Sequence, residues 1–154
     1  MGKYHWSIER VEQLRQLILS HRNIIILPHT APDGDALGST LAWAKVLQKA
    51  HPEATIRVLS PDSIENYLSW LPLLDELLIY PDAEEESLRA IHEADLLFHL
   101  DHNQPSRLRY TPLIEATEQS KAPHILIDHH LDPDPTFTLN FSYPEASATC
   151  ELIH

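Results

Sequence analysis

The stretch IIILPHTAPDGDALGS, residues 24–39, joins a short apolar run to a polar turn and then to the start of a helical pattern. The four apolar residues before Pro28 are typical of a buried strand. Beyond the turn, apolar residues recur at three- and four-residue spacing and predict a helix over 35–50. Gly34 would allow a close turn between its neighbouring aspartates, and Gly38 would allow the helix to pack near the sheet. This order of strand, turn and helix favours an α/β domain.

Strands and helices alternate through the rest of the chain. Short apolar runs predict further strands at 55–59, 76–80, 94–100 and 124–128. Helical spacing predicts helices at 6–19, with Ser7 as its cap, and at 84–92 and 108–119. Strands separated by helices pair in parallel through right-handed crossovers. We therefore expect a three-layer α/β/α domain with a mainly parallel sheet.

The composition fits one globular domain, because 154 residues with 43% hydrophobic content can bury a core. No apolar run approaches the roughly 18 residues that a membrane span needs. Lys3 and Glu9 interrupt the apolar positions near the start, so a secretory signal is not indicated. The single cysteine, Cys150, excludes an internal disulfide and a cysteine-based zinc cluster. We expect a cytoplasmic protein without a membrane partner.

The formal charge of −12 at pH 7 argues against passive binding to nucleic acid. Such binding draws much of its affinity from cationic side chains that displace counterions from phosphates. An enzyme that acts on phosphate remains compatible with this charge, because bound divalent ions reverse the local sign of an acidic site.

Imidazole and carboxylate groups follow three of the predicted strands. They are His29, Asp33 and Asp35 after the first strand, Asp101 after 94–100, and Asp128, His129 and His130 at the end of 124–128. Open α/β sheets bind ligands at the carboxyl ends of their strands. These three segments are therefore expected to converge on one edge of the sheet.

Each segment alone also has a plain structural interpretation. HTAPDGD, residues 29–35, contains the residue types common in turns, and Asp101 alone is compatible with a loop. Their joint position at strand ends favours a metal site. Imidazole and carboxylate ligands without thiolate suit Mn²⁺, Mg²⁺, Fe²⁺ or Zn²⁺. Two ions bridged by a carboxylate would activate water for hydrolysis of a phosphoester.

The segments HTAPDGDALGS, LDHNQPSR and IDHH together resemble motifs I, II and III of the DHH phosphoesterase superfamily, which includes RecJ-type exonucleases. The resemblance spans roughly residues 24–153. PDGDALGS is more similar to the NrnA-type nanoRNases, which are also 3′-phosphoadenosine 5′-phosphate phosphatases, than to the PDTDS form of family II pyrophosphatases. The terminal ASATCELI also resembles the NrnA branch.

The resemblance implies two divalent ions, Mn²⁺ in the first place and Mg²⁺ as the alternative. One ion would be bound by His29, Asp33 and Asp101. The other would be bound by Asp35, Asp101 and His129, so that Asp101 is the bridge.

The resemblance also implies roles beside the ions. His130 would contact the substrate phosphate or assist the leaving group, and Asp128 would orient a neighbouring histidine. Asn103 and Arg107 would position phosphate, although Arg107 is equally compatible with a solvated charge at a helix start.

Two family features cannot be placed in this sequence: the aspartate of a fourth motif and a C-terminal DHHA1 domain with a glycine-rich, basic stretch. We therefore expect 1–154 to be the incomplete N-terminal part of a DHH phosphoesterase that hydrolyses short oligonucleotides or a nucleoside bisphosphate. A pyrophosphatase or a cyclic dinucleotide phosphodiesterase is the alternative within the enzyme class. A catalytically incomplete metal-binding or interaction module is the alternative from another class, and an oligomer is compatible with all three.

Several other residues favour plain interpretations. The glutamates at 84–86 indicate a solvated helix start. His99 is expected to be packed rather than to bind a ligand, and His102 lies closer to the expected site. Trp43 and Trp70 are expected to fill core or interface space, with base stacking as the alternative.

Overall fold

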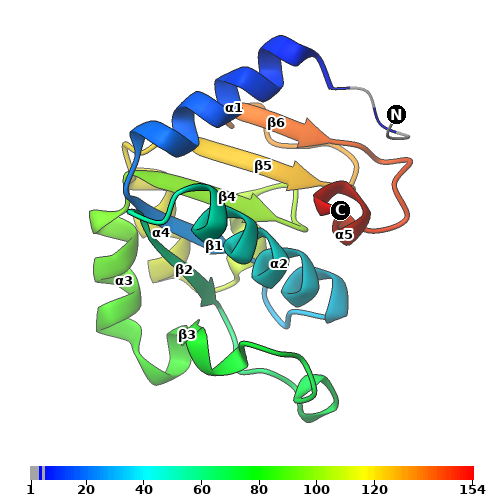
Figure 1. Ribbon diagram of the computed structural model, residues 1–154. Coiled ribbons are helices and arrows are strands. Elements are labelled where there is room, and N and C mark those ends of the chain that lie inside the picture. Colours follow the sequence, from blue (N-terminus) through cyan, green and yellow to red (C-terminus); the bar gives the residue numbers. More distant parts are fainter. Residues whose placement is uncertain (1–3, 5) are drawn as a thin grey trace.

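A six-stranded, wholly parallel sheet forms the middle layer of the protein, in the order β3-β2-β1-β4-β5-β6 (Figure 1). The computed structural model describes Tyr4 and residues 6–154. Its strands are β1 (Asn23–Leu27), β2 (Thr55–Ser60), β3 (Leu78–Ile79), β4 (Leu96–Leu100), β5 (His124–Asp128) and β6 (Leu139–Ser142).

Helices cover both faces of the sheet, which confirms the predicted three-layer α/β/α fold. On one face lie α1 (Ile8–Ser20), α2 (Gly34–Ala50) and α5 (Thr149–Ile153), and on the other lie α3 (Glu84–Glu93) and α4 (Thr111–Gln119) (Figure 1). Successive side chains of β1 point to opposite faces of the sheet, as they do along any strand. Ile24 and Ile26 join the core under α1 and α2, whereas Ile25 and Leu27 join the core under α3 and α4.

The starts of α1 and α2 are capped by side chains. Ser7 accepts a hydrogen bond from the backbone N–H of Arg10, as predicted. Asp33 caps α2 by accepting the N–H groups of Asp35 and Ala36, each at 3.0 Å. Because Asp33 is also a predicted metal ligand, the start of α2 fixes a site residue.

Two predicted elements have other bounds in the structure, and one strand of the structure was not predicted. The strand expected at 76–80 is only Leu78–Ile79, because the chain makes a 3₁₀ turn on each side of it. The helix expected at 108–119 begins at Thr111, because Arg109 has a left-handed backbone with φ of 67°. The strand β6 was not predicted, since its sequence LNFS lacks the apolar run that marks the other long strands.

The two glycines of the first motif do not act as expected. Gly34 has no positive φ, and a Cβ there would meet only Leu68 at 3.9 Å, so the turn does not need a glycine. Gly38 does allow a close approach, but to α5 rather than to the sheet. A Cβ at Gly38 would lie 3.1 Å from Sγ of Cys150.

The connections of the sheet leave β1 and β4 side by side, and β5 lies next to β4. From β1 the chain runs outward to β2 and β3, and from β4 it runs outward in the opposite direction. Ligands of open α/β sheets bind beyond the strand ends at such a reversal. None of the helices in the described part of the chain has the length and apolar character needed to span a bilayer.

Candidate metal centre

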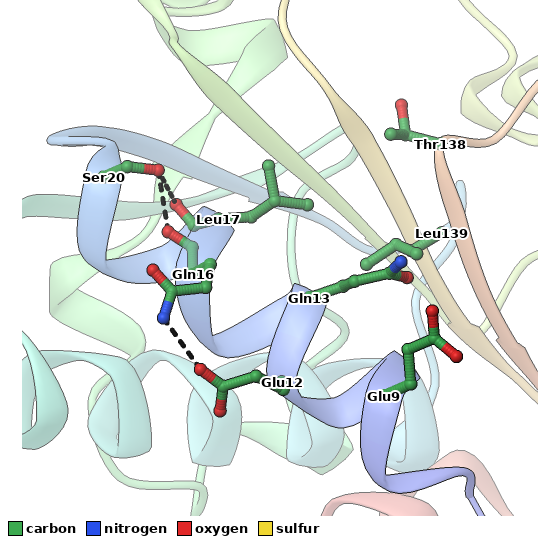
Figure 2. Close-up of a pocket in the computed structure, with 8 residues that line it drawn as sticks. All are labelled: Glu9, Glu12, Gln13, Gln16, Leu17, Ser20, Thr138 and Leu139. Atoms are coloured by element: carbon green, nitrogen blue, oxygen red, sulfur yellow. Dashed lines mark hydrogen bonds between the residues drawn. The ribbon is translucent and has the colours of Figure 1, made fainter.

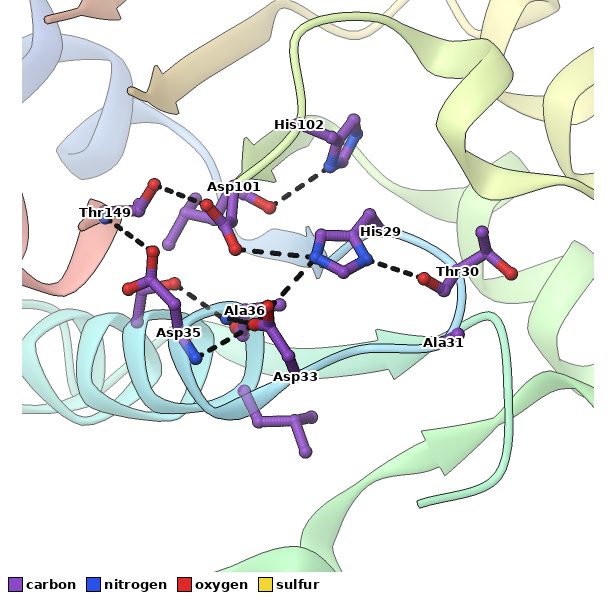
Figure 3. Close-up of polar contacts among 12 residues, drawn as sticks. His29, Thr30, Ala31, Asp33, Asp35, Ala36, Asp101, His102 and Thr149 are labelled. Atoms are coloured by element: carbon purple, nitrogen blue, oxygen red, sulfur yellow. Dashed lines mark hydrogen bonds and ion pairs between the residues drawn. The ribbon is translucent and has the colours of Figure 1, made fainter. Parts of the chain in front are cut away.

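Asp101 lies at the middle of the predicted site, between His29 and His129, which come from different loops. Figure 3 shows its contact with His29. Its Oδ2 is 3.5 Å from Nε2 of His29, which follows β1. Its Oδ1 is 3.4 Å from Nε2 of His129, which follows β5. A single carboxylate thus presents one oxygen to each imidazole, which is the arrangement that a bridging ligand requires.

Backbone carbonyls orient both imidazoles. Nδ1 of His29 lies 2.6 Å from the carbonyl of Thr30, and Nδ1 of His129 lies 3.2 Å from the carbonyl of Ala146. Because a carbonyl can only accept, Nδ1 carries the proton in each neutral ring, and the lone pair of Nε2 faces Asp101. Metal-binding histidines are held in this way by the hydrogen bond of their other nitrogen.

Asp33 and Asp35 complete the surroundings of His29 and His129. Figure 3 shows both acids together with His29. Oδ1 of Asp33 is 4.0 Å from Nε2 of His29, and Oδ2 of Asp35 is 3.6 Å from Nε2 of His129. His29, Asp33 and Asp101 form one group whose ligand atoms all lie within 4.8 Å of one another. The structure therefore brings together the first predicted ligand set.

The second close group consists of Asp101, His129 and His130, whereas Asp35 was the predicted third member. Asp35 is near, but its two oxygens accept hydrogen bonds from the backbone N–H groups of Thr149 and Cys150, each at 2.8 Å. The start of α5 therefore fixes this carboxylate beside His129.

Thr149 was not singled out from the sequence, although it contacts two predicted ligands. Its Oγ1 donates a hydrogen bond of 2.8 Å to Oδ1 of Asp101, and its N–H donates to Asp35 (Figure 3). The available signal was a threonine at the head of the helix in ASATCELI, a segment that was used only for its family resemblance.

The surroundings shift the pKa values of Asp101 and Asp35 in opposite directions. Burial raises the pKa of Asp101, and the negative charge of Asp35 adds to this effect. Burial also opposes ionisation of Asp35, but the N–H groups of Cys150 and Thr149 outweigh it and lower the pKa. Burial alone would lower the pKa of His29, but its bonds to Asp101 and Thr30 and the nearby acids raise it. Negative charge concentrated around imidazole rings that can be neutral favours the binding of a divalent cation.

Asp62, which follows β2 at the same edge of the sheet, holds the loop of the first motif. It accepts hydrogen bonds from Oγ1 of Thr30 and from the N–H of Ala31, the latter at 2.6 Å. Its other oxygen accepts from the hydroxyl of Tyr110 at 2.7 Å. Because the carbonyl of Thr30 orients His29, Asp62 positions a predicted ligand indirectly. The sequence analysis missed it, although its place after a predicted strand was a usable signal.

The remaining predicted site residues lie around this centre. Asp128 is fully buried, and its Oδ1 lies 2.7 Å from Nδ1 of His130, as expected of an orienting pair. The amide of Asn103 donates to the carbonyl of Leu131 at 2.7 Å and so ties down the loop after His130. Arg107 is exposed, and its carbonyl accepts from the N–H of Thr30 at 2.9 Å.

His99 and His102 are packed beside the site. Nδ1 of His102 lies 3.1 Å from the carbonyl of Leu100, and its Nε2 lies 3.0 Å from Nδ1 of His99. Nε2 of His99 lies 3.0 Å from Nδ1 of His124. Burial lowers the pKa of His102 to about 3, so this ring stays neutral. The expectation that His99 is packed is confirmed.

A groove of about 620 Å³ lies elsewhere, between α1 and the start of β6 (Figure 2). Its lining consists of Glu9, Glu12, Gln13, Gln16, Leu17, Ser20, Thr138 and Leu139. It contains no imidazole or thiol, so the chemistry of the molecule is concentrated at the strand ends.

Known proteins resemble this chain in sequence and in fold. Residues 23–154 match the DHH family, N-terminal domain. The cyclic-di-AMP phosphodiesterase GdpP of Geobacillus thermodenitrificans is 31% identical in an alignment of length 150 that covers 91% of this chain and 22% of that protein. The probable bifunctional oligoribonuclease and PAP phosphatase NrnA of Streptococcus mutans is 28% identical over 136 residues, which are 88% of this chain and 38% of that protein.

The fold recurs in a crystal structure of an exopolyphosphatase-related protein from Bacteroides fragilis. The two structures superpose with a TM-score of 0.88 at 28% sequence identity, over 97% of this chain and 44% of that one. The chain thus spans well under half the length of these relatives.

Proposed function

The chain belongs to the DHH family, and we propose that it is the catalytic domain of a metal-dependent phosphoesterase acting on short oligonucleotides or 3′-phosphoadenosine 5′-phosphate. The observation that carries this proposal is the position of Asp101, with one oxygen toward His29 and the other toward His129. A buried carboxylate shared by two imidazoles from different strand ends suits the bridge of a two-ion centre.

The donor set fits divalent ions. Its imidazole nitrogens and carboxylate oxygens lie 3.4 to 4.0 Å apart, and an ion about 2.1 Å from two donors spans up to about 4.2 Å. We propose two ions, Mn²⁺ first and Mg²⁺ as the alternative, held by His29, Asp33, Asp35, Asp101 and His129. When bound, the ions would lower the pKa of a water molecule and neutralise phosphoryl oxygens.

The chain's own residues supply binding and proton transfer. Asp128 accepts from Nδ1 of His130 and so directs Nε2 of that ring away from the buried acid. We assign to Nε2 of a protonated His130 the donation of a proton to the leaving oxygen, or a hydrogen bond to the phosphate. Arg107 would contact phosphate through its guanidinium, and Asn103 would keep the loop after His130 in place.

The activities for which two relatives are named support a nucleotide substrate. NrnA of Streptococcus mutans is named for oligoribonuclease and PAP phosphatase activities. A cyclic dinucleotide phosphodiesterase is the second candidate, because GdpP of Geobacillus thermodenitrificans is the 31% identical relative. We further propose a DHHA1-type domain as the structural partner that completes the substrate site, and a cytoplasmic location.

The test is hydrolysis by the full protein that carries this chain. With Mn²⁺, it should release phosphate from 3′-phosphoadenosine 5′-phosphate or mononucleotides from the dinucleotide pApA, and chelation by EDTA should stop the reaction. Cyclic di-AMP, assayed in parallel, distinguishes the second candidate. Binding of Mn²⁺ without hydrolysis of any of the three would instead support the inactive module.

A further inference from the structure

Two large aromatic side chains stand out from the surface close together in sequence. Tyr67 is 66% exposed and Trp70 is 75% exposed, and they are the aromatic members of the exposed large apolar residues in the described chain. By contrast, Trp43 is partly buried and packs edge-on against Phe98. Trp70 therefore does not fill the core. Interface space, the other part of that expectation, stays a prediction, and base stacking was the alternative.

The local backbone places both rings on one side. After the 3₁₀ turn η1 (Asn66–Leu68) the chain goes on turning, and the N–H groups of Ser69 and Leu71 donate to the carbonyls of Asn66 and Leu68, three residues earlier. Side chains three apart lie above one another in this geometry. Leu68 and Leu71 accordingly share the inner side and pack into the core, which leaves Tyr67 and Trp70 on the outer side.

The turn and the residues before it contact the metal-binding loop at two points. Leu68 approaches Gly34, where a Cβ would lie 3.9 Å from its Cδ2, and Gly34 lies between Asp33 and Asp35. Six residues before Leu68, Asp62 holds Thr30 and Ala31 by hydrogen bonds. The aromatic pair therefore belongs to a turn that packs beside the metal-binding loop.

An uncharged aromatic surface at this place suits a nucleobase better than a phosphate. Asp62 and Glu65 precede the pair in sequence and would repel a second phosphate group. Stacking on aromatic rings accepts any base, because every base has a flat π-face. We propose that Tyr67 and Trp70 form a stacking platform for a base of the substrate while its phosphate lies at the metal centre.

This inference rests on the proposed function and deepens it. It predicts that the site prefers nucleotides to phosphates without a base, such as inorganic polyphosphate. The structural relative is related to exopolyphosphatases by its name, so this preference separates two kinds of substrate within one fold.

Calorimetry with 5′-AMP and ribose 5-phosphate tests the platform, using the full protein with Mn²⁺. We expect AMP to bind about tenfold more tightly than ribose 5-phosphate, given the energy of one stacked base. The Trp70→Ala variant should lose most of this difference, Tyr67→Ala part of it, and Trp70→Phe little. The Ile8→Ala variant, which changes an 89% exposed side chain on α1, is the matched control and should bind as the wild type does.

Three results would overturn the platform: absent AMP binding, equal affinity for the two ligands, or unchanged AMP affinity in both alanine variants. A lowered melting temperature of Trp70→Ala with unchanged AMP affinity would show that the ring packs against another part of the protein. Hydrolysis of pApA by the wild type is measured separately. Turnover without base preference contradicts only the platform, whereas base-dependent binding without turnover contradicts only the proposed function.

Discussion

The hydroxyl of Thr149 donates a hydrogen bond of 2.8 Å to Oδ1 of Asp101, across 48 positions of the sequence. Through this bond the head of α5 reaches the residue at the middle of the candidate metal centre. The N–H of the same threonine donates to Asp35. The orientation of both acids therefore depends on where α5 lies against α2.

Substitution of the two glycines of α2 tests this dependence. A Cβ at Gly38 would lie 3.1 Å from Sγ of Cys150 and push α5 outward, whereas a Cβ at Gly34 makes only an ordinary contact. We expect Gly38→Ala to weaken Mn²⁺ binding by about 10- to 100-fold, as loss of supporting contacts does. Gly34→Ala should bind Mn²⁺ as the wild type does. Calorimetric Mn²⁺ titration of both variants measures this, and equal affinities would contradict the role of α5.

Asp101→Asn should separate activity from folding. Asp101 has a left-handed backbone with φ of 62°, which asparagine adopts more readily than alanine does. The amide cannot bridge two ions, so we expect Mn²⁺-dependent hydrolysis to fall by more than about 100-fold. In EDTA the variant should melt no lower than the wild type, because a buried charge next to Asp35 is removed. Wild-type turnover in this variant would exclude Asp101 as the bridge.

Asp62 should contribute stability that depends on pH. Burial opposes its ionisation, but bonds from Thr30, Tyr110 and Ala31 lower its pKa below the ordinary value of 3.8. A carboxyl group whose pKa is lower in the folded state than in the unfolded state stabilises the protein at pH values above the unfolded-state pKa. This contribution to stability is lost as the pH falls through the folded-state pKa. Asp62→Asn should therefore unfold at lower urea concentration than the wild type at pH 7, and the gap should close below about pH 4.

The Tyr110→Phe variant is the matched control for Asp62, since it removes one of the three hydrogen bonds and leaves the carboxylate in place. We expect a gap from the wild type smaller than that of Asp62→Asn. A gap for Asp62→Asn that stayed constant between pH 7 and pH 3 would refute the electrostatic account.

His124 should add a pH dependence of the same direction as that of Asp62, in a higher pH range. Burial lowers its pKa below 6.5 in the folded state, where its Nδ1 lies 3.0 Å from Nε2 of His99. The unfolded chain takes up a proton as the pH falls below 6.5, and the folded chain does so only at lower pH. Stability should therefore fall from pH 7 toward pH 5. In His124→Gln this fall, measured by chemical denaturation, should be smaller, and an identical pH profile would count against the assignment.

Much of the sheet could be predicted from the sequence because its central strands are continuous apolar runs. Residues 24–27 and 125–127 are buried and consist only of isoleucine and leucine, so their pattern is unambiguous. The strand β6 lies at the edge of the sheet and buries only Phe141 fully, which leaves too weak a pattern to find. The shortened β3 is set by the flanking 3₁₀ turns, which hydrophobic spacing does not reveal.

The ligand loops could be predicted because parallel strands carry their carboxyl ends to one edge, whatever the loops contain. The supports of the site could not. Thr149 and Asp62 act through two or three hydrogen bonds each to residues far away in sequence, and no local pattern marks such partners. The roles of Asn103 and Arg107 toward substrate stay predictions.

The strand order has a consequence for how the domain is completed. One half of the sheet, β1 to β3, carries His29, Asp33 and Asp35, whereas the other half, β4 to β6, supplies Asp101 and His129. During synthesis from the amino end, the first half exists before the second. A divalent ion held by ligands from both halves of the sheet would bind only after the two halves have docked. It would stabilise the docked halves relative to the separated ones. Binding of the ion would then coincide with the docking of the two halves in the newly synthesised domain.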